Sequence, residues 1–336
     1  MQIVIPLAGF GKRLRPHTFT KPKPLINVAG KPVLGHVLDT FAALADVEEI
    51  IFIVGHLGEQ IEEYVAKEYP HLKATYYKQE ELNGQSTAIY LAHERLRGPM
   101  LMVFVDTIIK TDLSALQRET ADAVTWVKAV DDPRRFGVAE VGADGLVTRL
   151  IEKPADLANN LAVVGFYYFK QSEKLMAAIR EQIARNIQTQ NEYFLADAVN
   201  LMLQAGLKMR VQPVEVWQDC GKTETVLETN RYLLENGHDN SAAHGEALTG
   251  DGSSYVIVPP VNIHPTAKIV NSVIGPHATV AAGCRIAHSI VRDSIVDEES
   301  VVEDALLAGS LIGRSARVTG RFRAFNVGEA SEVGFE

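Results

Sequence analysis

Apolar runs and amphipathic stretches alternate along the first two thirds of the chain. Short runs that are almost wholly apolar, as is typical of buried strands, occupy residues 3–5, 50–54 and 100–105. Apolar residues recur at helical spacing in residues 33–44, 172–183 and 195–205. Strands that alternate with helices in this way predict an α/β domain with a mostly parallel sheet over residues 1–236.

The pattern changes after this domain. Residues 237–254 are rich in Gly, Ser, Asn, His and Asp and read as a linker. From residue 255 to 336, apolar residues recur every six positions, for example at Ile274, Val280 and Ile286 and again at Ile295, Val301 and Leu307. This hexad spacing predicts a parallel β-helix of about four coils, with a small sandwich of irregular strands as the alternative.

Length and composition agree with two domains. The chain has 336 residues, of which 46% are hydrophobic and 22% charged, enough for a sizeable core in a globular protein. A net charge of −9 argues against a nucleic-acid surface. The two cysteines form no disulfide framework, and no secretory signal or membrane-spanning run is visible, so we expect a cytoplasmic protein.

The candidate chemistry begins directly after the first apolar run. Gly9 and Gly11 allow a sharp turn in which backbone amides can face phosphate oxygens, and Arg13 and Lys23 add two cations to the same loop. Leu14 stands where a dinucleotide-binding loop would have its third glycine, and no GxxxxGK[ST] motif is present. The loop is therefore predicted to hold a triphosphate.

This loop, G-x-G-x-R-L followed by Pro22-Lys23-Pro24-Leu25, resembles the signature of the sugar-phosphate nucleotidyltransferases. The resemblance covers essentially the whole chain and is closest to the long-form glucose-1-phosphate thymidylyltransferases. It implies a Rossmann-like nucleotidyltransferase domain followed by a left-handed, hexapeptide-repeat β-helix. It also implies Mg²⁺-dependent transfer of a nucleotidyl group from a nucleoside triphosphate, with dTTP favoured, to a hexose 1-phosphate, with glucose 1-phosphate favoured.

The resemblance also assigns residues to the nucleotide and its metal. Arg13 and Lys23 would hold the triphosphate and the leaving group, and Asp106 and Asp219 would bind Mg²⁺. Gln79 would read the base, since an amide offers one donor and one acceptor to thymine or uracil. The remaining nucleotide-binding residues would be Leu7, Ala8, Gly9, Gly11 and Gly84.

A second group of residues would bind the sugar phosphate. Lys153 would bind the attacking phosphate, and Glu152 would bind sugar hydroxyls. The amide of Gly137 would face the sugar, Val164 would form the floor of the pocket, and Glu192 would help to place the ring.

Several positions depart from the family pattern. Lys12 stands in place of a small hydroxyl residue, and Cys220 stands in place of a hydroxyl residue beside Asp219. Val105-Asp106-Thr107 replaces Gly-Asp-Asn, and Gln85-Ser86-Thr87 replaces a more apolar run beside the base. These departures bear on which substrates are used more than on the type of reaction.

Two other functions fit parts of the sequence. One is a bifunctional uridylyltransferase and acyltransferase for aminosugar phosphates, with His264, His277 and His288 as candidate bases. The other is a non-catalytic, sugar-nucleotide-sensing regulatory protein. In each case the open ends of a β-helix lead us to expect a homo-oligomer.

Overall fold

A mixed sheet forms the centre of the N-terminal part of the chain. The computed structural model describes residues 1–44, 46–244 and 254–320. Seven strands of the sheet follow the order β10-β9-β11-β6-β1-β4-β5, and β8 pairs with both β11 and β12. Their bounds are β1 Gln2–Pro6, β4 Glu49–Val54, β5 Ala74–Lys78, β6 Met100–Val103, β8 Ala123–Ala129, β9 Gly137–Val141, β10 Val147–Glu152, β11 Leu161–Phe169 and β12 Met209–Pro213.

The middle of this sheet is parallel, as the apolar runs predict. Strand β1 pairs in parallel with both β4 and β6, and β4 pairs in parallel with β5. Strand β11 runs antiparallel to β6, β8 and β9. The predicted Rossmann-like α/β fold is confirmed, with β11 as the point at which the sheet changes direction.

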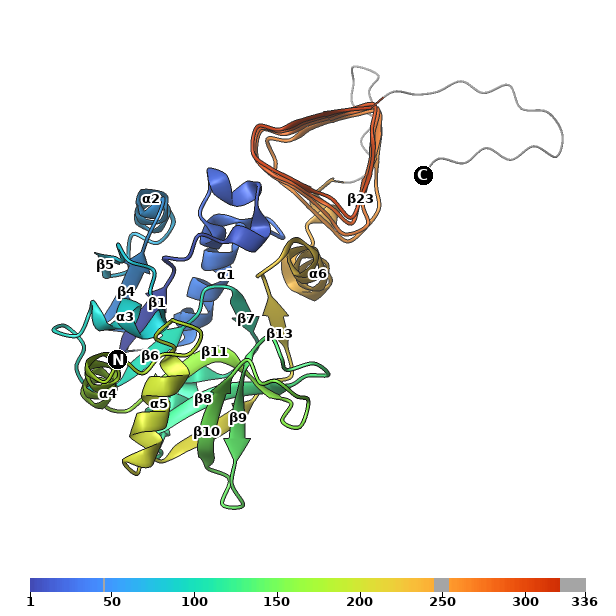
Figure 1. Ribbon diagram of the computed structural model, residues 1–336. Helices are drawn as coiled ribbons and strands as arrows, with labels where there is room; N and C mark the ends of the chain where they lie inside the picture. Colours follow the sequence, from blue (N-terminus) through green and yellow to red (C-terminus); the bar gives the residue numbers. More distant parts are fainter. Residues whose placement is uncertain (45, 245–253, 321–336) are drawn as a thin grey trace. The chain divides into compact units, whose positions relative to one another are not determined.

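Helices cover both faces of the sheet (Figure 1). Alternate residues of β1 and β4 point to opposite faces: Val4 and Ile51 join one core cluster, and Ile3 and Ile50 join the other. The first cluster includes side chains of α3 (Gln85–Tyr90), α4 (Ser172–Ala184) and α5 (Leu195–Gln204). The second includes side chains of α1 (Val33–Thr40) and α2 (Gly58–Glu68).

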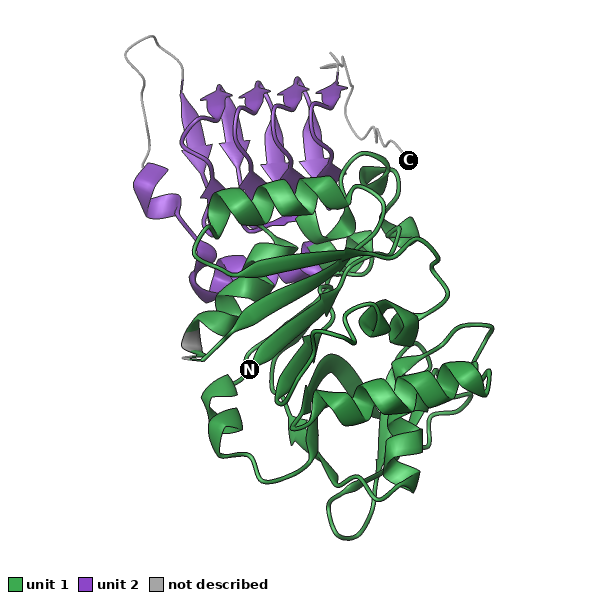
Figure 2. Cartoon of the chain, turned by 90° about the vertical axis from the view of Figure 1, so that its left-hand side faces the viewer, with its two compact units in different colours: residues 1–26, 31–226 green, residues 27–30, 227–336 purple. Residues whose placement is uncertain are grey.

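Residues 27–30 and 227–336 form a second compact unit, and residues 1–26 and 31–226 form the first (Figure 2). Most of helix α6 (Thr223–Leu233) therefore belongs to the second unit. The whole of the two-residue strand β2 (Asn27–Val28) also belongs to it, whereas β3 (Lys31–Pro32) belongs to the first unit. Residues 245–253 of the predicted linker and residues 321–336 of the predicted β-helix lie outside the described residues.

The second unit contains three parallel sheets of four short strands, and Figure 1 shows them as the sides of a triangle. This arrangement is the four-coil parallel β-helix that the hexads predict, in the left-handed form that the family resemblance implies. The first sheet is β14 Tyr255–Ile257, β17 Ser272–Ile274, β20 Ile290–Arg292 and β23 Leu306–Ala308. The second is β15 Val261–Ile263, β18 Ala278–Val280, β21 Ile295–Val296 and β24 Leu311–Ile312. The third is β16 Lys268–Val270, β19 Arg285–Ala287, β22 Val301–Glu303 and β25 Arg317–Thr319.

The repeat in this unit is shorter than three full hexads. Val256 pairs with Val273, Val273 with Ile290, and Ile290 with Leu306, so successive coils are offset by less than eighteen positions. The interior residues of the third coil are consequently Val296 and Val302, which align with Val280 and Ile286. Ile295 and Val301, which belong to a six-residue series in the sequence, each stand one position before this row, because the shorter coil shifts the spacing between coils.

No helix within the described residues is long and apolar enough to cross a lipid bilayer.

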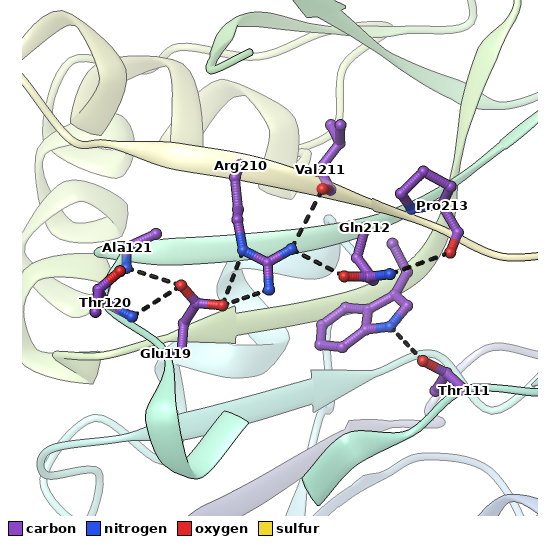
Figure 3. A network of polar contacts seen from close by, with 9 residues as sticks. Thr111, Glu119, Thr120, Ala121, Arg210, Val211, Gln212 and Pro213 are labelled. Atoms are coloured by element: carbon purple, nitrogen blue, oxygen red, sulfur yellow. Dashed lines mark hydrogen bonds and ion pairs between the residues drawn. The ribbon is translucent and has the colours of Figure 1, made fainter. Parts of the chain in front are cut away.

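A buried ion pair braces strand β12 against the chain that precedes β8 (Figure 3). Both Nε and Nη2 of Arg210 donate to Oε2 of Glu119, and Arg210 Nη1 donates to Gln212 Oε1. Oε1 of Glu119 accepts the amides of Thr120 and Ala121. Burial alone would raise the pKa of Glu119, but these donors outweigh it and lower that pKa. The charged carboxylate is thus the form that stabilises the fold.

Replacing this carboxylate tests its contribution to stability. We expect Glu119→Gln to lower the free energy of unfolding by roughly 1–2 kcal/mol at pH 7, measured by urea denaturation. Because folding lowers the pKa of Glu119, the wild-type advantage is present above the ordinary value of 4.5 and is lost as pH falls below it. Glu181→Gln, which breaks the exposed pair with Arg185, is the matched control and should change little. Equal stability of wild type and Glu119→Gln at pH 7 would contradict this account.

Candidate active site

The loop after β1 is folded tightly against its neighbours. The amide of Leu7 donates to the carbonyl of Ile53, and any side chain at Gly55 would collide with the carbonyl of Ala8. Gly11 has a φ of 61°, and a Cβ atom there would lie 3.0 Å from the Cβ of Lys23. Gly11 therefore allows the two halves of the signature, G-x-G-x-R-L and P-K-P-L, to lie side by side.

Two short strands bring Asp106 and Asp219 together from distant parts of the sequence. Strand β7 (Thr107–Ile109) pairs antiparallel with β13 (Trp217–Asp219), which places Asp219 opposite Thr107. The amide of Cys220 donates to the backbone carbonyl of Asp106 at 2.9 Å. The pairing thus sets Asp219, at the end of β13, next to Asp106, which directly precedes β7.

Two cations lie beside this carboxylate pair. Nζ of Lys23 lies 2.5 Å from Oδ2 of Asp106. A Cβ atom on Gly221 would lie 2.8 Å from Oδ1 of Asp219 and 3.1 Å from Nη2 of Arg13, so the Arg13 guanidinium and the Asp219 carboxylate flank the same glycine. Residues that are far apart in sequence therefore form one compact group of two carboxylates and two positively charged side chains.

Burial and charge act differently on the two acids. Burial would raise the pKa of Asp106, but the ammonium of Lys23 and the guanidinium of Arg13 lower it overall. Burial raises the pKa of Asp219, and the neighbouring negative charge of Asp106 raises it further. The pKa values of the two neighbouring acids are thus shifted in opposite directions.

This pair has the chemistry of a magnesium site. Mg²⁺ is commonly held by one or two carboxylates together with substrate phosphates and water. Asp106 and Asp219 could supply two such carboxylates to a metal ion; within the described ranges no group of three or more His, Cys, Asp or Glu side chains is placed to hold one.

The other side of the site is built on a β-hairpin. Gly137 on β9 lies opposite Glu152 on β10, and a Cβ atom on Gly137 would lie 3.1 Å from Oε2 of Glu152. The amide of Lys153 donates to the carbonyl of Phe136 at 2.9 Å and continues the pairing at the open end of the hairpin. Glycine at 137 therefore leaves room beside the carboxylate.

A break in the regular pairing of β11 brings Val164, the predicted floor of the sugar pocket, to the site. The register with β8 shifts between Val163 and Tyr167, and Gly165 within the shift has a φ of 88°. A Cβ atom on Gly165 would lie 2.9 Å from the ring of Phe104, so only glycine fits. This irregularity lets Val164 face the site from a strand that is otherwise part of the sheet core.

A cavity of about 230 Å³ joins the two sides. Six of the predicted site residues line it: Arg13, Asp106, Gly137, Glu152, Val164 and Asp219. The carboxylate pair and the hairpin therefore open into one space. The other predicted residues are not among those that line this cavity in the described part of the chain: Leu7, Ala8, Gly9, Gly11, Lys23, Gln79, Gly84, Lys153 and Glu192.

The sequence interpretation missed several lining residues: Phe104, Arg135, Tyr167, Ala196 and Trp217. Some had a local signal, since Arg135 precedes the Phe136-Gly137 element and Trp217 lies two residues before Asp219. Trp217 packs edge-on against Phe136, with ring centroids 4.8 Å apart, and so connects β13 to the hairpin. Ala196 and Tyr167 gave no signal, because each is buried and apolar like its neighbours in sequence.

Acidic neighbours surround Glu152. Burial raises the pKa of Glu152, and the charges of Asp197 and Glu192 raise it further against the opposing effect of Lys153. Lys153 has a φ of 47°, and its Nζ lies 5.1 Å above the Phe194 ring and 3.4 Å from Gln190 Oε1. Glu152, Lys153 and Glu192 thus gather around the segment that precedes α5.

The residues predicted to read the base form a separate cluster. Gln79 is buried, and its Nε2 donates to the carbonyl of Gly84 at 3.2 Å. Gly84 has a φ of 138°, and a Cβ atom there would lie 2.5 Å from the backbone of Tyr193. Gln85, the next residue, lines the cavity and accepts the amide of Leu195 at the start of α5. Gln79 and Gly84 therefore contact each other, and Gly84 is followed in the sequence by Gln85, which lines the cavity.

The three histidines of the acyltransferase alternative lie in the second unit. Nδ1 of His264 contacts Thr266, and Nε2 of His277 contacts Glu235 at 2.8 Å. His288 lies between Asn271 and Asp304, at 3.3 and 3.5 Å. Each histidine therefore has a polar neighbour within the unit.

The comparison with known families matches residues 3–236 to a family described as "Nucleotidyl transferase". The chain belongs to this family and is a sugar-phosphate nucleotidyltransferase.

Among curated proteins, the glucose-1-phosphate thymidylyltransferase of Streptomyces antibioticus is 31% identical over 99% of both chains. The bifunctional protein GlmU of Methanococcus vannielii is 32% identical, but the match covers 70% of this chain and 56% of that protein. A solved UDP-glucose pyrophosphorylase with bound UDP-glucose shares the fold, with a TM-score of 0.61, 20% identity, and coverage of 70% of this chain and 98% of that one.

The raised pKa of Glu152 predicts that its charged carboxylate lowers the stability of the folded protein. Because the folded protein raises its pKa, ionisation of Glu152 costs stability as pH rises above the ordinary value of 4.5. We expect Glu152→Gln to increase the free energy of unfolding by about 1 kcal/mol at pH 7, and the gain to disappear below pH 4.5. Urea denaturation at pH 7 and pH 4 measures both values. A loss of stability at pH 7 would contradict the prediction.

Proposed function

We propose that this nucleotidyltransferase uses Mg²⁺ to transfer a thymidylyl group from dTTP to glucose 1-phosphate, producing dTDP-glucose and pyrophosphate. The single observation that carries the proposal is the convergence of Asp106 and Asp219 beside Arg13 and Lys23, in a cavity that Gly137 and Glu152 also line. The choice of dTTP and glucose 1-phosphate is supported by similarity to a thymidylyltransferase along the full chain, β-helix included.

In this reaction an oxygen of the sugar phosphate attacks the α-phosphorus of the nucleotide. The bond from that phosphorus to the β-phosphate oxygen breaks, and pyrophosphate leaves with the electron pair. Both reactants are anions, so the protein must neutralise their charge and align them in one line. The residues of this site are suited to those two tasks, and no covalent intermediate with the protein is required.

Asp106 and Asp219 would hold the metal ion, which neutralises phosphate charge when bound. Arg13 would donate to the triphosphate from its place beside Gly221. Lys23 contacts Asp106 and would exchange this contact for the triphosphate and the leaving pyrophosphate. The amides of the loop at Leu7, Ala8, Gly9 and Gly11 would donate to the same phosphates.

Gln79 and Gly84 would select the base. The Gln79 amide presents a donor and an acceptor, which match the N3–H and carbonyl of thymine or uracil but do not distinguish the two. Gln85 and Thr87 add polar groups next to this position, and Thr87 donates to Gly84 O at 3.0 Å. These residues favour a pyrimidine, and thymine is preferred here on the similarity to thymidylyltransferases.

The hairpin of β9 and β10 would bind the sugar phosphate. Glu152 would accept sugar hydroxyl groups, the amide of Gly137 would donate to the ring, and Val164 would contact its apolar face. Lys153 would bind the attacking phosphate, and Glu192 would help to orient the sugar from the segment before α5. Thr107 occupies the place of the family asparagine and offers one hydroxyl in place of an amide.

We also propose that the protein assembles as a homo-oligomer through its β-helix. One outward row of the first sheet is aliphatic in every coil, at Val256, Val273, Ile290 and Leu306. Leu306 is 74% exposed, which is unusual for a large aliphatic side chain.

The release of pyrophosphate across a matrix of substrates tests the function. We expect the highest kcat/KM with dTTP and glucose 1-phosphate, and loss of activity when EDTA removes the metal. Asp106→Ala should lower kcat by at least about a hundredfold because it removes a carboxylate from the reacting phosphates.

The matched control is Asp156→Ala, which removes an exposed carboxylate from the loop after β10 and should retain full activity. Circular dichroism should show that both variants are folded. Near-normal turnover by Asp106→Ala, or nucleotide binding without turnover over the whole matrix, would contradict the proposal; the latter would favour a sensor.

A further inference from the structure

A four-residue turn of the N-terminal sequence belongs to the second unit. Residues 27–30 are assigned to this unit with residues 227–336, although the chain on both sides belongs to the first. Ala29 has a φ of 47° and Gly30 a φ of 84°, so the turn contains a non-glycine residue in a left-handed conformation. Such a conformation persists only when surrounding contacts hold it in place.

Asn230 of α6 supplies one of these contacts. The amide of Ala29 donates to Oδ1 of Asn230 at 2.8 Å, and Asn230 is 1% exposed. The same oxygen accepts Oγ1 of Thr279 at 2.7 Å, and Nδ2 donates to the carbonyl of His277 at 3.1 Å. The second coil of the β-helix therefore holds the Asn230 carboxamide in place, and the carboxamide holds the backbone at Ala29.

Asn262 of β15 supplies the other contact. Its side-chain amide fills the space next to Gly30, so that any side chain at position 30 would collide with it. Nδ2 of Asn262 donates to the carbonyl of His238 at 2.8 Å, which sets its orientation. Two asparagines held by the second unit thus determine the path of residues 29 and 30.

The turn lies only a few residues after Lys23. A short 3₁₀ turn spans Lys23–Leu25, and the amide of Ile26 donates to the carbonyl of Lys23 at 3.1 Å. The carbonyl of Ile26 accepts the amide of Val33 at 3.0 Å, which closes the chain across the turn. A shift of Ala29 would therefore be transmitted through hydrogen-bonded backbone to Lys23.

We propose that the β-helix unit positions the Lys23 segment of the active site, with Asn230 and Asn262 as positioning residues that do not touch substrate. This inference rests on the proposed function, in which Lys23 binds the triphosphate. It gives the β-helix a role in nucleotide binding by the transferase domain, separate from assembly and from any chemistry of its own.

Substitution of Asn230, compared with a matched control, tests this role. Asn230→Leu removes the acceptor for Ala29, whereas Thr279→Val removes another donor to the same oxygen without touching residues 27–30. We expect Asn230→Leu to raise the KM for the nucleoside triphosphate roughly tenfold and to leave the KM for the sugar 1-phosphate unchanged. Thr279→Val should keep both KM values. Simple destabilisation would instead reduce the active fraction and lower the maximal rate without changing either KM.

A second variant and a second measurement cover the case in which Asn230→Leu does not fold. Asn262→Ala should also raise the KM for the triphosphate alone. Hydrogen–deuterium exchange of the apoprotein should show faster exchange over residues 23–30 in both variants and not in Thr279→Val.

Unchanged exchange over residues 23–30 together with an unchanged triphosphate KM in Asn262→Ala would overturn the proposal. If Lys23→Ala raises the triphosphate KM while the asparagine variants do not, the positioning role fails and the proposed function stands. If wild-type protein releases no pyrophosphate from any substrate pair, the proposed function itself fails.

Discussion

The antiparallel pairing of β7 with β13 is the constraint on which the active site depends. It places Asp219 opposite Thr107 and so brings its carboxylate next to Asp106, which directly precedes β7. Burial raises the pKa of Asp219, and the negative charge of Asp106 raises it further. Lys23 and Arg13 reduce the repulsion between the two carboxylates, and the glycines at 11 and 221 leave room for the signature loop to lie close enough to do so. A site of this charge pattern is suited to the anionic phosphates of two substrates.

The rest of the transferase domain supports this constraint at several points. The register shift in β11 exposes Val164 to the cavity, and the hairpin of β9 and β10 carries Glu152 to the far side. Trp217 contacts Phe136 and joins this hairpin to the strand that ends in Asp219. The sugar side and the metal side are therefore connected by packing as well as by the shared cavity, and both rest on the same sheet.

The sequence predicted the parts of the fold that depend on local patterns. Apolar runs located β1, β4 and β6, and the hexads located four coils of the β-helix, because burial requires such residues at those spacings. The hexads did not give the alignment between coils, which pairs Val296 with Val280 and Val302 with Ile286, since it depends on how each coil stacks on the previous one. In the site, glycines, cations and carboxylates in motifs were recognised. Ala196 and Tyr167 were not, because only tertiary packing brings a buried apolar residue to a cavity wall.

The most direct test is to locate the metal. Crystals grown with Mn²⁺ in place of Mg²⁺ and with dTTP would show the ion by its anomalous scattering. The account predicts one strong peak bonded to carboxylate oxygens of both Asp106 and Asp219, with Lys23 turned from Asp106 toward the triphosphate. A peak that contacts neither carboxylate, in crystals of a protein that is active with Mn²⁺, would contradict it.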